Sequence, residues 1–552
     1  MMELAASRHV NRVEIVGRRA NRISLLSAEK ACAETSNLVG SGYSKALVAS
    51  CDAGLFFMKK FLSSSIVILC SAIACFAQNA SHNPTWWDKY TYLAKNGPLG
   101  EGGATSSISF GSNVDLSNEC GPQSETFITL NTRAPKMLAA GSNEIFRLPM
   151  RGYFSGNGGS SWGGVDLPLP PASGTNGIDF GSDPTLTFDS QGNLFYGYIV
   201  VFFGNGSGIN GTQMAVARSI DGGKSYPSVA FFGFEGGSNH FNDKPMITTD
   251  ANQNSPFRDN VYIAWDAAAG GSTGGGVRLA TSTDHGATFT IERVDDPSGP
   301  GRSIGASPAV GPNGELYVAW NDYTANAIVF NRSFDGGRNW DNPRTVSRKS
   351  IPFDIGIPAE SFRRALVYPS LDVDRSKGAH QGRIYASWMD LTQAGTTDIF
   401  ISYSDDYGRN WSAPTPVTDQ LSTAVDRFNH WMSVDAVTGE VNVAFYDTRN
   451  DTTGQRYMTD YYLAQSKDGG QTWLSPDIRV SNVSSNEHDC GGVFPCSGIN
   501  YGNQQGDYEG LVSFSGISYP IWTDSRRQTD TITGCSRNLA MEEVFSSKIN
   551  PH

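Results

Sequence analysis

One eight-residue phrase recurs along this sequence and constrains its fold more than any other feature. The phrase reads Ser-x-Asp-x-Gly-x-x-aromatic, and its five full copies lie at 219–226, 282–289, 333–340, 404–411 and 466–473. A sixth, weaker copy at 155–162 has Asn157 in place of the aspartate. The copies stand roughly 60 residues apart, and such a constant period indicates a repeat architecture in which each repeat is one supersecondary unit.

Each copy has the composition of a hairpin turn. The aspartate accepts backbone N–H bonds across the turn, the glycine supplies a positive φ, and the terminal aromatic ring packs underneath. Upstream stands a short strand that ends in an aromatic residue and an acid, as at 261–266 and 316–322, and a further strand precedes it. With one strand after the turn, each period holds four antiparallel strands, which form one blade of a propeller.

The repeats therefore predict an all-β fold, a seven-bladed β-propeller of four-stranded antiparallel blades that spans 119–548. Six units carry the turn, and a seventh at 506–524 repeats the first two strands without it. Six blades plus an appendage is the alternative.

An export signal stands before the repeats. Met58-Lys59-Lys60 precede an apolar run that ends at Ala77, and this order of charged, apolar and small residues is typical of a signal peptide. We expect a signal peptide at 58–77 and a mature chain that begins at Gln78.

This interpretation divides the rest of the N-terminal region. Residues 1–57 are then a mis-called extension, and 78–118 form an N-terminal linker segment. The mature protein is expected outside the cell or in the periplasm. A single membrane anchor and a lipid anchor through Cys75 stay open as alternatives.

Composition narrows the classes of function. The net charge of −12 opposes binding to nucleic acid and to anionic membranes. Because only 17% of residues are charged and 39% are hydrophobic, a disordered polyelectrolyte is excluded. We expect a monomer with no nucleic-acid partner and with no membrane span after removal of the signal peptide.

The cysteines after the predicted signal peptide suggest disulfides. They are Cys120, Cys490, Cys496 and Cys535, an even number in an exported chain. A bond between Cys120 and Cys535 joins the first blade to the last and is the pairing that we predict. Four cysteines permit three connectivities, so the sequence alone does not fix it.

The repeated phrase resembles the Asp box, or BNR repeat, of the sialidase-like superfamily of β-propellers. The resemblance covers roughly residues 119–545 and marks the fold, since Asp boxes also occur in propellers that hydrolyse nothing. The resemblance implies the site of sialidases, in which a tyrosine is the nucleophile, an aspartate is the acid/base and three arginines clamp a carboxylate. Tyr508 matches the position of the nucleophile, but Glu509 beside it faces the opposite side of a strand.

The arginines of the resemblance match less well. Arg147 stands in a Phe-Arg-Leu-Pro phrase close to the first turn, which displaces it from the expected opening strand. Arg449 and Arg526 follow equivalent strands of the last two blades, yet Asp447 and Asp524 stand two residues away and favour structural ion pairs.

The starts of the inner strands converge on one mouth of the central channel, where we expect the functional site. We expect Asp183, Asp243 and Asp507 to form a ring of carboxylates there, and this ring leaves Ca²⁺ binding open. The scattered histidines form no zinc cluster, and no other cofactor is indicated. We expect catalytic roles for Tyr508, Asp243 and Asp507, and ligand-binding roles for Asp183, Tyr368, His430, Trp431, Arg449 and Arg526.

The function that the sequence favours is a secreted propeller that binds a glycan or another extracellular ligand at its channel mouth. An exo-α-sialidase or related glycoside hydrolase is one alternative, and a protein-binding scaffold is another. The sequence does not decide whether the protein is an enzyme.

Overall fold

The computed structural model divides into two units, Met1–His82 and Asn83–His552. The predicted extension at 1–57, the signal peptide at 58–77 and the start at Gln78 lie outside the described residues. The structure describes residues 85–99, 106–173, 178–204, 209–236, 241–267, 276–296, 303–360, 363–422, 424–488, 505–527 and 542–550.

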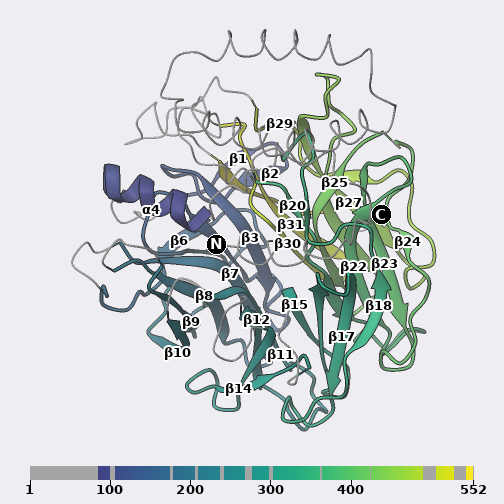
Figure 1. Cartoon of the computed structure of the whole chain (residues 1–552), viewed down its shortest axis with the longest axis horizontal. Helices are drawn as coiled ribbons and strands as arrows, with labels where there is room; N and C mark the ends of the chain where they lie inside the picture. Colours follow the sequence, from purple (N-terminus) through teal and green to yellow (C-terminus); the bar gives the residue numbers. More distant parts are fainter. Residues whose placement is uncertain are drawn as a thin grey trace, which may run out of the picture. The chain divides into compact units, whose positions relative to one another are not determined.

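The second unit is an all-β propeller with seven antiparallel blades (Figure 1), as predicted. Blades 1 to 3 comprise β3 (Gln123–Leu130), β4 (Leu138–Glu144), β5 (Arg151–Ser155) and β6 (Gly163–Asp166); β7 (Phe180–Phe188), β8 (Leu194–Phe202), β9 (Gly211–Ser219) and β10 (Ser228–Gly236); and β11 (Asn242–Thr249), β12 (Val261–Ala267), β13 (Gly276–Ser282) and β14 (Thr290–Arg293).

The other blades follow the same order, from the inner strand outward. Blades 4 to 6 comprise β15 (Ser303–Val310), β16 (Leu316–Asp322), β17 (Ala327–Ser333) and β18 (Arg344–Arg348); β21 (Ser370–Val373), β22 (Ile384–Leu391), β23 (Thr397–Ser404) and β24 (Thr415–Pro416); and β25 (Arg427–Val434), β26 (Val441–Asp447), β27 (Met458–Ser466) and β28 (Ile478–Arg479), with β29 (Ser485–Asn486) also paired to β27. A two-stranded sheet of β19 (Asp354–Ile355) and β20 (Ala365–Leu366) lies between β18 and β21.

Blade 7 is built from both ends of the propeller. Its strands run in the order β30 (Gly510–Phe514), β31 (Ile517–Asp524), β32 (Glu543–Ser547), β2 (Asn113–Asp115) and β1 (Ile108–Phe110). The structure thus extends the propeller back to Ile108, into the segment 78–118 that the sequence assigned to a linker. The reason is that the last repeat lacks its outer strands, and pairing of β2 with β32 supplies them.

Cys120 lies just after these strands and takes part in a disulfide bond. The predicted pairing with Cys535 falls outside the described residues and remains a prediction.

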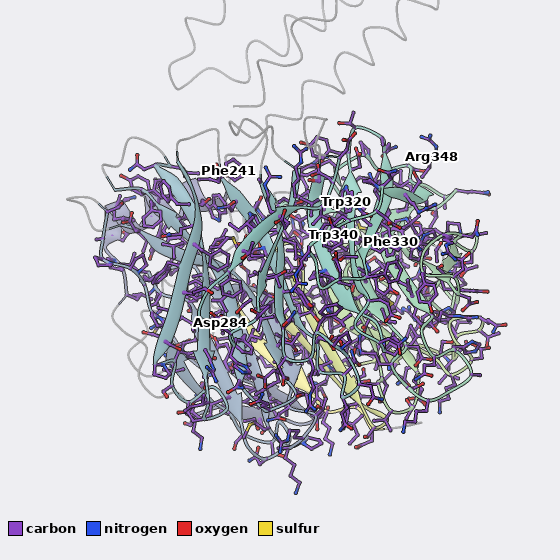
Figure 2. The ribbon with its side chains drawn as sticks, turned by 90° about the horizontal axis from the view of Figure 1, so that it is seen from below. Phe241, Asp284, Trp320, Phe330, Trp340 and Arg348 are labelled. Carbon is purple, nitrogen blue, oxygen red and sulfur yellow. The ribbon has the colours of Figure 1, made fainter. Side chains whose placement is uncertain are left out.

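The repeated phrase forms the turn between the third and fourth strands of six blades. In blade 4, the Ser333 hydroxyl donates to Asp335 Oδ1 at 2.8 Å, and the Gly337 N–H donates to Ser333 Oγ at 3.0 Å. Gly337 has φ +87°, which favours glycine there. The indole of Trp340 donates to the Gly337 carbonyl at 3.1 Å and packs against the buried cluster that holds Trp320 (Figure 2).

The core consists of side chains packed between adjacent blades. Trp265, Trp388 and Trp522 are among the largest fully buried side chains, each at the end of a second strand as the sequence pattern indicated. Because both faces of a blade meet a neighbour, these strands are buried along nearly their whole length.

A helix, α4 (Thr85–Asn96), packs on the first two blades. Its Tyr92 ring stacks on Phe146 with 3.8 Å between centroids, and the Trp86 indole donates to Ser182 Oγ at 3.1 Å. Within the described part of the chain, no helix is long and apolar enough to cross a membrane.

Candidate functional site at the channel mouth

The inner strands contact one another around a closed ring, from β3 to β30 and back to β3. Near the start of five of them, two residues oppose one on the second strand, which is a β-bulge. A bulge bends its strand and re-aims a side chain. The first bulge residues all have positive φ, and they are Glu125 (53°), Asp183 (61°), Lys244 (44°), Gly305 (73°) and Asn429 (44°).

Tyr368 and Tyr508 occupy the same sequence position in blades 5 and 7. The repeats therefore bring six side chains of five chemical kinds to one end of the ring, since blade 4 has a glycine at this position. We call the group around this end the mouth cluster, which comprises Glu125, Asp183, Asp243, Lys244, Arg363, Tyr368, Trp431, Asp507 and Tyr508.

Lys244 is a buried cation enclosed by aromatic rings. Its ammonium lies 4.2 Å from the ring centroid of Tyr508, 4.6 Å from that of Tyr368 and 5.3 Å from that of Trp431. Within the described residues, Nζ has no hydrogen-bond partner. Burial lowers the pKa of Lys244 to about 8, although the nearby carboxylates of Asp266 and Asp183 oppose this shift. Cation–π attraction to three rings thus replaces the hydrogen bonds that a buried ammonium usually makes.

Four carboxyl groups, from blades 1, 2, 3 and 7, act on this cation, and that of blade 3 is Asp266. Asp183 Oδ2 accepts the Lys244 backbone N–H at 3.1 Å, and Asp183 Oδ1 accepts the Ser182 hydroxyl at 2.5 Å. The Asp243 carboxyl hydrogen-bonds to that of Asp183. Asn143 Nδ2 donates to Glu125 Oε2 at 2.5 Å.

Burial and mutual repulsion disfavour full ionisation of this group. Burial raises the pKa of Glu125 well above its usual range, and the charges of Asp507 and Asp183 add to the shift. For Asp243 burial again dominates, and Asp183 is its strongest repelling neighbour. Burial also raises the pKa of Asp507, against the opposing effect of Arg363. The cluster therefore holds protonated carboxyl groups at pH values at which exposed carboxyls are ionised, which suits acid catalysis and hydrogen-bond donation.

Arg363 enters the mouth cluster from outside the repeats. It lies in the connection between β18 and β21, and its Nη2 donates to Glu125 Oε1 at 3.1 Å and, over a short distance, to Asp507 Oδ2. The Tyr368 hydroxyl donates to the same Asp507 oxygen at 3.3 Å. Asp507 Oδ1 has no partner among the described residues, and the same holds for Asn429 Oδ1.

The predicted site residues divide into two groups. The structure brings Asp183, Asp243, Tyr368, Trp431, Asp507 and Tyr508 together. His430 bonds instead to Ser387 Oγ at 2.9 Å within blades 5 and 6, and burial lowers its pKa to about 4, so its ring is neutral near pH 7.

The predicted arginines are held in ion pairs. Arg449 contacts Asp447, Asp419 and Asp477 at 2.7–2.9 Å. Arg526 lies 2.6 Å from Asp524. These contacts fit the structural ion pairs that the sequence favoured.

Arg147 is paired in the same way. It contacts Glu119 at 3.2 Å and Asp166 at 2.6 Å, and it is 2% exposed. Both Nη atoms of Arg147 are thus engaged by carboxylates, which opposes a role as a clamp for a ligand carboxylate.

The side chains of Tyr508 and Glu509 contact different residues, as the alternation of side chains along a strand predicted. The Tyr508 hydroxyl donates to the Pro184 carbonyl at 3.5 Å, and burial followed by the charge of Asp183 raises its pKa well above the usual range. Glu509 Oε1 instead accepts the Tyr446 hydroxyl at 2.7 Å and the Thr523 hydroxyl at 3.2 Å. A nucleophile is activated by an adjacent general base or by a lowered pKa, and the second of these routes is closed to Tyr508 in this environment.

Sequence reasoning missed Glu125, Lys244, Asn429 and Arg363 as site residues. The first three share the bulge position with Asp183, so aligning the inner strands would have found them. Arg363 carries no such signal, because its segment has no counterpart in the other repeats.

An open depression of about 490 Å³ lies near this connection. Tyr457 and His488 stack there with 4.0 Å between ring centroids, and His488 Nε2 lies 2.6 Å from the Pro358 carbonyl. Over the described ranges, no group of three His, Cys, Asp or Glu residues is placed to hold a metal ion.

No family model matches the sequence, and no curated protein matches it. Among solved structures, the chain is similar to an α-L-arabinanase from Penicillium chrysogenum, with 11% identity, a TM-score of 0.40, and coverage of 81% of this chain and 98% of that one. It is also similar to an intramolecular trans-sialidase from Ruminococcus gnavus, with 13% identity, a TM-score of 0.38, and coverage of 77% of this chain and 94% of that one. A third similar structure is a protein of unknown function from Dyadobacter fermentans, with 14% identity, a TM-score of 0.38, and coverage of 61% of this chain and 93% of that one. At such low identities and TM-scores, these likenesses carry no argument about activity.

Proposed function

We propose that this protein is an exported propeller that binds a glycan through the mouth cluster. The observation that carries the proposal is the joining, at one end of the ring, of three aromatic rings, four carboxyl groups and a buried ammonium that has no hydrogen-bond partner among the described residues. Sugars are bound by aromatic faces together with convergent hydrogen-bond donors and acceptors, and such groups in a folded site are placed for a ligand.

The unsatisfied polar atoms support this proposal. A buried donor or acceptor without a partner costs about 1–3 kcal/mol, and a ligand that pairs with it recovers part of this cost. Lys244 Nζ offers a donor, and Asp507 Oδ1 and Asn429 Oδ1 offer acceptors. Hydroxyl groups of a sugar satisfy both kinds of atom.

Binding of purified mature protein to an immobilised panel of neutral, amino and acidic glycans tests the proposal. We expect Lys244→Met and Asp507→Asn each to weaken binding at least tenfold. Phe334→Ala is the control, because Phe334 is 51% exposed and lies in the turn of blade 4. Unfolding temperatures identify variants that fail to fold. Absence of binding to every glycan, or binding that the two mouth variants leave unchanged, would refute the proposal.

Hydrolysis of a glycoside is the second candidate function. Asp183 and Asp243 share a hydrogen bond, and the raised pKa of Asp243 suits a general acid. We expect Asp243→Asn to abolish release of reducing sugar while glycan binding persists. Hydrolysis of an α-sialoside should be weak or absent, because Arg449 and Arg526 are engaged by carboxylates. Robust sialoside turnover that Tyr508→Phe abolishes would instead establish a sialidase.

A further inference from the structure

The mouth cluster stabilises positive charge, and in this structure the chain supplies that charge itself. The Lys244 ammonium lies among the three rings, and the Arg363 guanidinium bridges Glu125 and Asp507. Carboxylates and aromatic faces are the groups that bind alkylammonium and guanidinium ions. The chemistry of the cluster is thus complementary to a cation.

The two cations differ in how they are attached. Lys244 belongs to the bulge of β11 and is buried within the ring. Arg363 belongs to the connection between blades 4 and 5 and reaches across to blades 1 and 7. Its side chain is 14% exposed, against 5% for Glu125 and 10% for Asp507, so it is the most exposed member of this ion-paired group.

The connection is anchored at its base independently of Arg363. Lys349 Nζ donates to the Ile351 carbonyl at 2.7 Å, and the Ser350 N–H donates to Asp390 at 2.9 Å. Next to Arg363, the Arg364 guanidinium donates to Asp354 at 2.9 and 3.1 Å across the small β19–β20 sheet. These contacts of the connection are separate from the hydrogen bonds that Arg363 makes with Glu125 and Asp507.

Acceptor capacity remains at the same place. Asp507 is 9% exposed, and its Oδ1 has no partner among the described residues while Arg363 and Tyr368 share its Oδ2. Asn429 is 4% exposed and presents a second unpartnered oxygen. These atoms can accept hydrogen bonds from an ammonium group and an adjacent hydroxyl in addition to those already made.

We infer that Arg363 occupies the place of the ligand's own positive charge, and that the ligand is a glycan carrying free amino groups, which displaces Arg363 from Glu125 and Asp507. This inference rests on the proposed glycan binding and specifies its ligand. It makes Arg363 an autoinhibitory contact, since glycan and guanidinium compete for the same carboxylates. N-acetylated and acidic sugars lack the charge that this exchange requires.

Calorimetric titration at low salt tests the inference with a fully deacetylated glucosamine tetramer and its N-acetylated counterpart as probes. Arg363→Met removes the competing charge and should bind the amino tetramer at least tenfold more tightly than the unmodified protein does. The N-acetylated tetramer should gain less than twofold. Asp507→Asn in the Arg363→Met background should remove the gain.

Arg364→Met is the matched control, because this neighbour pairs with Asp354 and not with the mouth cluster; it should bind as the unmodified protein does. Arg363→Lys keeps the charge with a weaker, single-point contact, so a smaller gain of about two- to threefold is expected. It provides a second readout if Arg363→Met fails to fold.

Three results would overturn the inference. The first is unchanged or weaker binding of the amino tetramer to Arg363→Met, or to Arg363→Lys where only that variant folds. The second is an equal gain for the N-acetylated tetramer, which indicates steric opening alone. The third is a gain for a lysine tetrapeptide without one for the amino tetramer, which indicates a basic peptide partner. If neutral or acidic glycans still bind and Lys244→Met weakens their binding, the proposed function stands and only the inference fails.

Discussion

Replacement of Asp335 by alanine should destabilise the fold without affecting ligand binding. Four hydrogen bonds end on this carboxylate, from the Ser333 hydroxyl (2.8 Å), the Arg338 N–H (3.1 Å), the Asn339 N–H (2.9 Å) and Asn339 Nδ2 (2.6 Å). They close the turn between β17 and β18, at the edge of blade 4.

The expected loss follows from these bonds. Each contributes on the order of 0.5–1.5 kcal/mol, and exposure of the turn places them near the lower end, so Asp335→Ala should cost about 1–3 kcal/mol. For a unit of about 430 residues, with an unfolding entropy of about 2.1 cal/mol/K per residue, 2 kcal/mol corresponds to a decrease of about 2 °C in Tm.

Asp335→Asn is the matched comparison, because blade 1 already carries an asparagine at this position. Asn157 Oδ1 accepts the Ser155 hydroxyl at 2.9 Å and the Ser161 N–H at 3.0 Å, and its Nδ2 donates to Ser161 Oγ at 2.8 Å. An asparagine therefore makes the turn, and Asp335→Asn should lose less than half as much stability as Asp335→Ala.

The two variants should also differ with pH. Burial slightly opposes ionisation of Asp335, but hydrogen bonds from Asn339 and Ser333 outweigh it and hold its pKa below the usual value. A lowered folded-state pKa adds stability above the unfolded pKa of about 3.9, and this stability is lost as the pH falls through the folded value. The difference between the unmodified protein and Asp335→Asn should therefore be full at pH 7 and shrink below about pH 4.

Scanning calorimetry of the three proteins at pH 7, with glycan titration of each folded protein, provides the measurement. Equal Tm values for Asp335→Ala and the unmodified protein would show that the turn hydrogen bonds add no net stability. Loss of glycan affinity at unchanged Tm would place the turn in the binding site and refute the reasoning.

Three further predictions concern the ends of the chain. A protein that starts at residue 119 lacks β1 and β2, so it should elute as aggregate and unfold at a lower temperature than one that starts at Gln78; equal behaviour in size-exclusion chromatography and calorimetry would contradict the role of these strands. Non-reducing peptide mapping should recover Cys120 joined to Cys535, and a link from Cys120 to another cysteine would disprove this pairing. N-terminal sequencing of protein exported by its native host should begin at Gln78, whereas a chain that retains residues before Met58 would exclude the signal peptide.

The fold was predictable because one local sequence pattern specifies each blade. The turn phrase and the aromatic residue that ends each second strand recur at fixed spacing, so the number of blades followed from counting. The outer strands of blade 7 carry no turn phrase and lie at the other end of the sequence. Only the backbone pairing of Val114 with Ser546 and its neighbours reveals where they belong.

The candidate site was predictable only as far as it belongs to the repeats. Asp183, Asp243 and Asp507 were found because every inner strand starts at the same end of the ring. The bulge itself carries little sequence signal, since glutamate, lysine, asparagine and glycine all occupy its first position. Arg363 reaches the cluster through a connection whose path depends on tertiary packing, which no spacing in the sequence encodes.

Closure of the ring by β2 and β32 has a consequence for how the protein folds. The two strands are separated in the sequence by nearly the whole propeller, as the pair Asn113 and Ser547 illustrates. Their contact therefore forms only after the last blade has been synthesised. Until then β32 presents an unpaired edge, and another chain can add to it in place of β2. Folding yield should therefore depend on how long this edge waits for its own N-terminal strands, and crowded synthesis should favour chains joined through exchanged strands.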